Sequence, residues 1–291
     1  MLRKVVVATD LSGRSIAFLR RLKGLRDYGT EKCILLLCLG VQETASVAFS
    51  YSVHRLEQSL QYQKDILKRQ GYSVEARTVT GDLIGEINRT AMDEDCSAIV
   101  VGARARAMVS DLLFSGIADD VIHHAQKPVL VIRLDDEAIE GGAGVEAAEP
   151  DLCSHVLFPT DFSDNAGIAF DYVIGLATRG ARKITLVHIQ DKARISPHLD
   201  DRLDEFNKID NERLQRMKSI ILRESKAEVE TVIRYGSPVV EIIRLVSERD
   251  VTLVVMGNQG RGFVQELFLG SVSNNIARLS PSSVLLIPMP R

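Results

Sequence analysis

Short, continuous apolar runs alternate with longer segments of helical periodicity along this chain. Each half contains five such runs, and they are solidly hydrophobic rather than alternating. Continuous runs are typical of strands covered by helices on both faces of a sheet. The repeated strand–helix order therefore predicts an α/β fold with two doubly wound, five-stranded parallel sheets in tandem. The paired runs are Val5–Ser12 with Val156–Ser163, Ile34–Cys38 with Ile184–His188, Val74–Gly81 with Val229–Gly236, Ala98–Gly102 with Leu253–Gly257, and Pro128–Ile132 with Ser283–Ile287.

Helical periodicity fills the segments between these runs. Asp82 and Ser237 are suitable N-caps for the third helix of each half, and Pro238 suits a first helical position. Glu86 and Glu241 are expected to be charges on the helix surface. The other expected helices are Arg14–Asp27, Ser50–Gln70, Asn165–Thr178 and Pro197–Glu224.

A segment rich in acidic residues, glycine and alanine separates the two halves. It has no apolar period, which is typical of a flexible linker. We therefore expect a first domain at residues 1–134, a linker at 135–152 and a second domain at 153–291.

Composition narrows the class of protein. Apolar residues make up 45% and charged residues 26%, as in ordinary globular domains, and a net charge of −3 does not favour nucleic acid. No apolar run is long enough for a membrane span, and no signal peptide is recognised. Four cysteines without a CxxC pair suggest reduced thiols, so we expect a cytoplasmic protein.

The most informative segment is the glycine-rich stretch Gly257–Gly262, followed by Gly270-Ser271. It comes directly after a predicted strand, and its glycines allow the backbone to approach a ligand closely. Peptide N–H groups in such a loop, followed by a helix N-terminus, suit a phosphate. The first strand of the same half ends at Asp161, so a carboxylate and this loop should meet across one crevice.

The spacing Gly257-x2-Gly260-x9-Gly270-Ser271, with Thr160-Asp161-x-Ser163, resembles the ATP-binding pattern of the universal stress protein family. The likeness extends over almost the whole chain, twice, as in a tandem universal stress protein. It implies a Rossmann-like, adenine nucleotide alpha hydrolase-like fold with strand order 3-2-1-4-5. It also implies ATP or AMP as ligand, with Mg²⁺ accompanying ATP, and a role in stress response or signalling.

The resemblance assigns a role to each matching residue of the second half. Asp161 would accept hydrogen bonds from the nucleoside, and the glycines would expose backbone N–H groups to the phosphates. Ser271 and Ser273 would add hydroxyl donors, and Val272 a further N–H. The nucleotide-binding set is Pro159, Thr160, Asp161, Met256, Gly257, Gly260, Gly270, Ser271, Val272 and Ser273.

The first half departs from the pattern. Ala105 stands in place of the second glycine, and the order Ser115-Gly116 inverts the Gly-Ser pair. Asp10 and Gly102 survive. We therefore expect a weaker second site at Asp10, Gly102, Ser115 and Gly116.

Catalysis lacks a clear set of residues. No Walker lysine accompanies the glycines, no metal-ligand spacing is present, and no nucleophile–histidine arrangement is recognised, so at most slow ATP hydrolysis is expected.

Two hypotheses for the function stay open. The first is a nucleotide-responsive regulator in which the ligand orders the loop Arg261–Leu269 for a protein partner of unknown identity. The alternative is a non-nucleotide binding module or scaffold. Within the family, paired fifth strands would give an intramolecular pseudo-dimer, which could form a homodimer.

Overall fold

The computed structural model describes residues 2–40, 47–104, 112–134, 151–260 and 269–290. The chain divides into two compact units, Met1–Glu149 and Pro150–Arg291. Each unit is an α/β domain, and the two are described in turn. No helix among the described residues is both long and apolar enough to cross a membrane.

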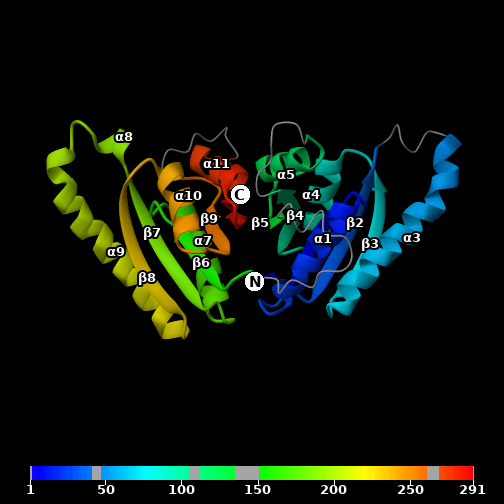
Figure 1. Ribbon diagram of the computed structural model, residues 1–291, viewed down its shortest axis with the longest axis horizontal. Coiled ribbons are helices and arrows are strands. Elements are labelled where there is room, and N and C mark those ends of the chain that lie inside the picture. The colour runs from blue at the N-terminus through cyan, green and yellow to red at the C-terminus, as the bar shows by residue number, and fades with distance from the viewer. Residues whose placement is uncertain (1, 41–46, 105–111, 135–150, 261–268, 291) are drawn as a thin grey trace. The chain divides into compact units, whose positions relative to one another are not determined.

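The first unit is a parallel sheet with strand order β3-β2-β1-β4-β5. Helices α1 and α3 pack together on one face, and α4 and α5 pack together on the other (Figure 1). Its elements are β1 (Lys4–Thr9), α1 (Gly13–Arg21), the 3-10 helix η1 (Leu22–Arg26), β2 (Lys32–Leu39), α3 (Val47–Arg69), β3 (Ser73–Thr80), α4 (Leu83–Asp93), β4 (Ala98–Arg104), α5 (Leu112–His124) and β5 (Val129–Leu134).

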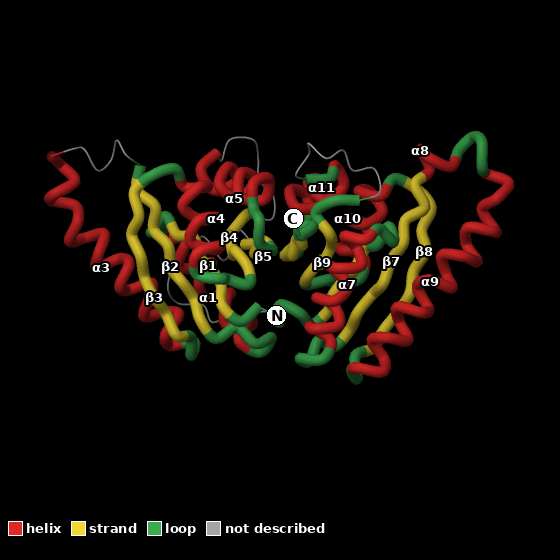
Figure 2. Tube along the Cα trace, turned by 180° about the vertical axis from the view of Figure 1, so that it is seen from behind, coloured by secondary structure: helices red, strands yellow, loops and turns green. Residues whose placement is uncertain are grey.

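The second unit repeats this plan with strand order β8-β7-β6-β9-β10. Helices α7 and α9 cover one face, with α9 lying along β7 and β8, while α10 and α11 cover the other (Figure 2). Its elements are β6 (His155–Pro159), α7 (Asp164–Ala177), β7 (Lys183–Asp191), α8 (Lys192–Ile195), the 3-10 helix η2 (Asp200–Arg202), α9 (Leu203–Glu224), β8 (Glu228–Gly236), α10 (Pro238–Glu248), β9 (Leu253–Gly257), α11 (Ser271–Leu279) and β10 (Ser283–Ile287).

Both units therefore have the order 3-2-1-4-5 in their own strand numbering, and the predicted fold class is confirmed. Strands β5, β6, β9 and β10 are buried at every position, as their continuous apolar runs predict. The edge strand β8 is only partly buried, and its residues are correspondingly more polar. Burial on both faces thus explains the sequence pattern from which the sheet was predicted.

Several details differ from the sequence prediction. Helix α9 begins at Leu203 instead of Pro197, because residues 192–202 form the separate short helices α8 and η2 and their connection. Asp82 caps α4 by accepting from the N–H of Gly85 at 2.7 Å, but Ser237 makes no side-chain capping bond. Helix α1 ends at Arg21 and continues as the short 3-10 helix η1.

The expectation that Glu86 and Glu241 are surface charges is wrong. Glu86 is only 9% exposed and Glu241 only 8% exposed. Each lies against the glycine that ends the preceding strand, with its side chain about 3 Å from the place where a Cβ would stand on Gly81 or Gly236. Each glutamate also pairs with an arginine three residues further on, which compensates its charge.

The register of the second strand also differs by one residue from the expected alignment. Val5 pairs with Cys33 in the first unit, and Val156 pairs with Ile184 in the second. Cys33, rather than Ile34, is therefore the counterpart of Ile184. It follows that His188 corresponds to Leu37 and not to Cys38. A uniform apolar run carries no internal mark of register, so the sequence alone left this unresolved.

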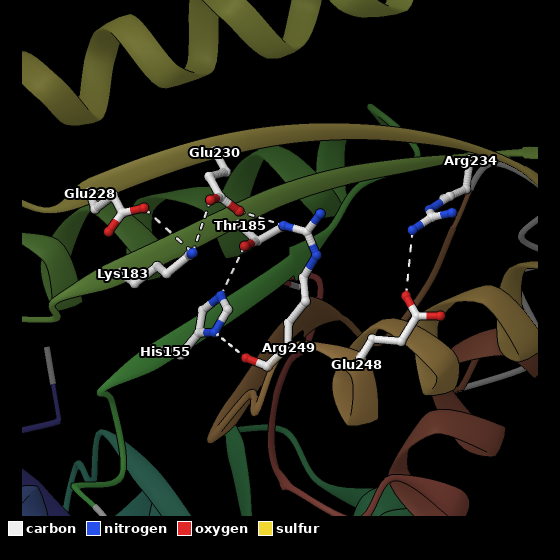
Figure 3. Close-up of polar contacts among 8 residues, drawn as sticks. All are labelled: His155, Lys183, Thr185, Glu228, Glu230, Arg234, Glu248 and Arg249. Carbon is white, nitrogen blue, oxygen red and sulfur yellow. Dashed lines mark hydrogen bonds and ion pairs between the residues drawn. The ribbon is translucent and has the colours of Figure 1, made fainter.

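Polar side chains occupy the amino ends of the strands in the second unit, at the edge opposite the ends that carry the glycine loop (Figure 3). His155 at the start of β6 is 6% exposed; its Nδ1–H donates to the Arg249 carbonyl at 2.8 Å, and its Nε2 lies 2.9 Å from the Thr185 hydroxyl. Beside it, Glu230 bridges Lys183 and Arg249. The group joins β6, β7 and β8 to the end of α10.

In the first unit, other residues tie the end of the corresponding helix, α4, to the first strand. Lys4 is the counterpart of His155, and its Nζ donates to the Glu94 carbonyl at 2.8 Å and to the Glu94 carboxylate at 2.5 Å. Lys4 and Arg77 together hold the pKa of Glu94 down at about 2. The helix end is thus tied to the first strand in both units, by a histidine in one and by a lysine in the other.

Stability of the second unit should depend on His155. Burial lowers the pKa of His155 from its ordinary value of 6.5. Near that pH, His155 is therefore protonated in the unfolded chain but stays neutral in the folded unit. Folding stability should therefore fall as the pH drops through that value. We expect His155→Gln to reduce this part of the pH dependence, measured by urea denaturation between about pH 8 and pH 5.

The exposed His198 provides the matched control. His198→Gln should leave the wild-type pH dependence unchanged, because His198 is exposed and its replacement leaves the contacts of His155 intact. If His155→Gln kept the full wild-type slope, the assignment of that slope to His155 would be wrong.

Candidate functional site

A cavity of about 660 Å³ lies at the carboxyl ends of β6, β7 and β9 in the second unit. Strand order reverses between β6 and β9, which is the place where open α/β sheets bind ligands. All ten residues that the sequence predicted as a nucleotide site line this one cavity. They are Pro159, Thr160, Asp161, Met256, Gly257, Gly260, Gly270, Ser271, Val272 and Ser273.

A tight turn after β6 presents Asp161. The Thr160 hydroxyl accepts from the N–H of Phe162 at 3.0 Å, and one carboxylate oxygen of Asp161 accepts from the N–H of Ser163 at 3.0 Å. Ser163 then caps α7 through the N–H of Ala166. Phe162 adopts a φ of 59°, an uncommon conformation for a large side chain. Because Ser163 caps the helix, the Asp161 side chain stays at the cavity wall.

The glycine loop after β9 packs directly on this turn. A Cβ placed on Gly260 would stand 2.7 Å from the second carboxylate oxygen of Asp161. A Cβ placed on Gly257 would stand 2.4 Å from the side-chain oxygen of Asn165. A side chain at Gly257 would therefore displace Asn165, including its backbone, and one at Gly260 would push the Asp161 carboxylate aside, so the loop lies close against that carboxylate.

Asn165, in the first turn of α7, supports the loop from below. Its side-chain oxygen accepts from the N–H of Gln259 at 2.9 Å, and its amide nitrogen donates to the Ile287 carbonyl at 3.2 Å. The residue is 4% exposed. The sequence analysis missed it, although one signal was present, since the corresponding residue of the first half is Arg14.

Helix α11 opens at the far side of the glycine loop. Gly270 occupies its N-cap and lacks a side chain, so no side chain caps the first N–H groups of the helix. The first turn, Ser271 to Ser273, lines the cavity with these groups. The hydroxyl of Ser273 donates to the Gly257 carbonyl at 2.9 Å, and its predicted use toward a phosphate stays a prediction.

Beta strand β7 and helix α9 form the opposite wall, which is more polar than the sequence suggested. His188 donates through Nδ1 to the Thr160 carbonyl at 2.7 Å, and its Nε2 lies 3.5 Å from the Asp210 carboxylate. Gln190 donates to the same carboxylate at 3.1 Å. His188 was expected near the crevice, whereas Gln190 and Asp210 were not, because α9 comes from a distant part of the chain.

The first unit shares the turn but not the walls. Leu11 has the same φ of 59°, and Asp10 accepts from the N–H of Ser12. Asp10 also accepts from the Ser15 hydroxyl, whose counterpart in the second unit is Ala166. In the first unit, the Thr9 hydroxyl at this turn also lies 2.6 Å from the side-chain oxygen of Gln63, a buried residue of α3.

The helix N-terminus is also placed differently in the first unit. Gly116, the counterpart of Ser271, lies inside α5, which begins at Leu112. Ser115 lies inside the same helix, Gly102 lies within β4, and Ala105 is outside the described residues. The weaker second site therefore stays a prediction, with Asp10 as its best-formed part.

The fold and the cavity define a doubly wound α/β protein with one ligand crevice in its second unit. Residues 1–133 and 153–288 both match the universal stress protein family, and the chain belongs to that family as a tandem member. It is 29% identical over 150 residues to the universal stress protein MJ0577 of Methanocaldococcus jannaschii, covering 45% of this chain and 93% of that protein.

Solved structures show the same fold over the full length. A universal stress protein from Archaeoglobus fulgidus superposes with a TM-score of 0.74 at 23% identity, covering 99% of this chain and 97% of the other. A functionally unknown protein from Pseudomonas aeruginosa superposes with a TM-score of 0.64 at 16% identity, covering 99% and 93%. The tandem arrangement of two such domains is therefore shared with other proteins.

Removal of the Asn165 side chain should loosen the glycine loop. Asn165→Ala removes the side-chain acceptor of the Gln259 N–H and one of the two donors to the Ile287 carbonyl, which keeps the N–H of Asn258, so we expect a loss of about 2 kcal/mol in the free energy of unfolding. Amide hydrogen exchange at Gln259 should accelerate as well.

Asn275→Ala is the control, since Asn275 is exposed on α11 and donates to the Ser271 carbonyl of its own helix. It should cost less than about 0.5 kcal/mol. Equal costs for the two variants would contradict the supporting role of Asn165.

Proposed function

We propose that the second unit binds an adenine nucleotide, ATP or AMP, and that the protein is a nucleotide-responsive regulator. The observation that carries the proposal is that the glycine loop and the Asp161 carboxylate lie close together and line the same cavity. A carboxylate accepts hydrogen bonds from sugar or base, while a glycine loop and a helix N-terminus favour phosphate. A nucleotide combines both chemistries.

The base fits against the edge of β7. Pairing between β6 and β7 ends at Pro159 and Val187, whereas β7 continues to Asp191. Peptide groups of alternate residues point to the same side of a strand, so the N–H and C=O of Ile189 face the crevice beyond the end of β6. One donor and one acceptor side by side match the edge of adenine, and Met256 and Ile242 supply apolar walls.

The phosphates fit on the opposite side, at Gly270 to Ser273. The free N–H groups of α11 and its dipole favour negative charge there. No cluster of metal-ligating side chains occurs among the residues that the structure describes. Mg²⁺ would therefore be bound chiefly by the phosphates of ATP, as is common for this ion.

Binding rather than turnover accounts best for this arrangement. Of the carboxylates around the cavity, Asp191 and Asp210 are paired with arginines, and Asp161 packs on the glycine loop. All three carboxylates are thus engaged by other groups of the protein, so efficient phosphoryl transfer is not proposed. The signal would pass to a protein partner through the loop after Gly260, whose residues 261–268 lie outside the described part.

ATP should stabilise the wild-type protein. With free ligand about 100-fold above its dissociation constant, the gain in unfolding free energy is about 2.7 kcal/mol. Gly260→Ala should abolish most of that gain, because the new methyl would collide with Asp161 at 2.7 Å. Differential scanning fluorimetry and isothermal titration calorimetry measure both quantities, and we expect at least about tenfold weaker binding.

Gly167→Ala is the matched control, because a Cβ on Gly167 in α7 meets nothing within 4 Å. It should retain wild-type ATP binding. Mass spectrometry of protein purified from cells tests the alternative of a non-nucleotide binding module. A different small molecule in the purified protein, with no shift by ATP or AMP, would overturn the proposal in favour of that alternative.

A further inference from the structure

The side chain of the residue that follows Asp161 contacts two elements, β7 and α9. The ring of Phe162 lies 4.7 Å from the ring of His188 on β7 and 5.2 Å from the guanidinium of Arg213 on α9. Asp210, one turn before Arg213, lies 3.6 Å from that guanidinium and 3.5 Å from the imidazole of His188. We call Phe162, His188, Asp210 and Arg213 the Phe162 clamp.

His188 contacts the chain on both sides of Asp161. Its Nδ1–H donates to the carbonyl of Thr160, and its ring stacks on Phe162. One imidazole therefore fixes the residues immediately before and after the carboxylate that packs on the glycine loop. His188 is also part of the cavity wall, and its side chain is 12% exposed.

The first unit shows that the turn does not need such a clamp in order to fold. Leu11 replaces Phe162 and Leu37 replaces His188, yet Leu11 adopts the same φ of 59°. Thr9, Asp10 and Ser12 make the same backbone contacts as their counterparts. Since folding of the turn is achieved without the clamp, the added side chains of the second unit call for a different explanation.

We propose that the Phe162 clamp positions Asp161 for the ligand and that a proton on His188 strengthens binding of an anionic nucleotide. The inference rests on the proposed function of the cavity. Protonation turns Nε2 into a donor toward Asp210 and adds a positive charge to the cavity wall, and histidine changes charge between about pH 5 and 8. Because proton and ligand binding are linked, ATP affinity should rise as the pH falls.

The other charged groups around His188 do not reverse the expected rise of ATP affinity at low pH. Asp210 and Arg213 on α9 form a neutral pair, and Asp191 with Arg194 forms another at 3.6 Å. Asp161 lies on the neighbouring turn. β8 and α10 contribute the ion pairs Arg234 with Glu248 and Arg244 with Glu241, and the pairs of Glu228 and Glu230 with Lys183 and Arg249 lie at the amino ends of the strands. The proton on His188 is therefore the main change of charge at this wall within the histidine range.

Isothermal titration calorimetry with ATP between about pH 5.5 and 7.5 tests the proposal. Three variants are compared with the wild type: His188→Leu and Phe162→Leu, which introduce the residues of the first unit, and His188→Gln, which keeps a donor for Thr160 but cannot titrate. ATP loses charge on its own terminal phosphate in this range, and that effect is common to all of them. The informative quantity is thus the ratio of wild-type to variant affinity.

We expect that ratio for His188→Gln to grow about fivefold from the upper to the lower pH, and Phe162→Leu to bind ATP about fivefold more weakly at both. His54→Leu, which removes an exposed histidine of α3, should match the wild type. Melting temperatures of the variants without ATP report any loss of folding separately.

A constant ratio for His188→Gln across the pH range, together with wild-type affinity in Phe162→Leu, would overturn the clamp while leaving nucleotide binding intact. If the wild type itself bound no ATP at any pH, the proposed function would fail and this inference with it. Should His188→Leu not fold, the Gln and Phe162→Leu variants still decide the question.

Discussion

The contact between Gly260 and the Asp161 carboxylate is the constraint on which the rest of the site depends. Two segments separated by about a hundred residues approach so closely there that a Cβ on Gly260 would stand 2.7 Å from a carboxylate oxygen of Asp161. Asn165 maintains that approach from beneath, because its side chain binds both the loop at Gln259 and the end of β10 at Ile287. The glycines are therefore required first by packing against the chain itself, and their exposure of N–H groups to a ligand follows from that packing.

Comparison of the two units separates what the fold needs from what the crevice needs. Both units keep the Thr-Asp-x-Ser turn, the buried glutamates Glu86 and Glu241, and a bond from the first strand to the end of the third helix. The residues that differ surround the crevice: Asn165 against Arg14, and His188 against Leu37. One fold thus tolerates two quite different sets of side chains at the same place, as is expected when function resides in the site rather than in the scaffold.

Much of this architecture was predictable from the sequence. The continuous apolar runs predicted the parallel strands, and Asp161 with Gly257 and Gly260 predicted where the cavity would form. The register of β2 and β7 was not predictable, because Ile34 and Cys33 are equally apolar. The burial of Glu241 was missed as well, since only the absence of a Cβ on Gly236 gives room for it. Gln190 and Asp210 were missed because their pairing depends on how α9 packs on β7.

The polar wall of the cavity also bears on how the protein could respond to a ligand. Helix α9 is linked to the turn that carries Asp161 by Asp210, His188 and Arg213. Asn165, in the first turn of α7 directly after that turn, links it to the glycine loop. A ligand that contacts both the carboxylate and the loop therefore acts on α9 and α11 through short chains of contacts. A change in their positions needs a differential interaction with the ligand. Under the proposed function, the anionic end of a nucleotide at α11 and a proton on His188 at the opposite wall would provide two such interactions within one crevice.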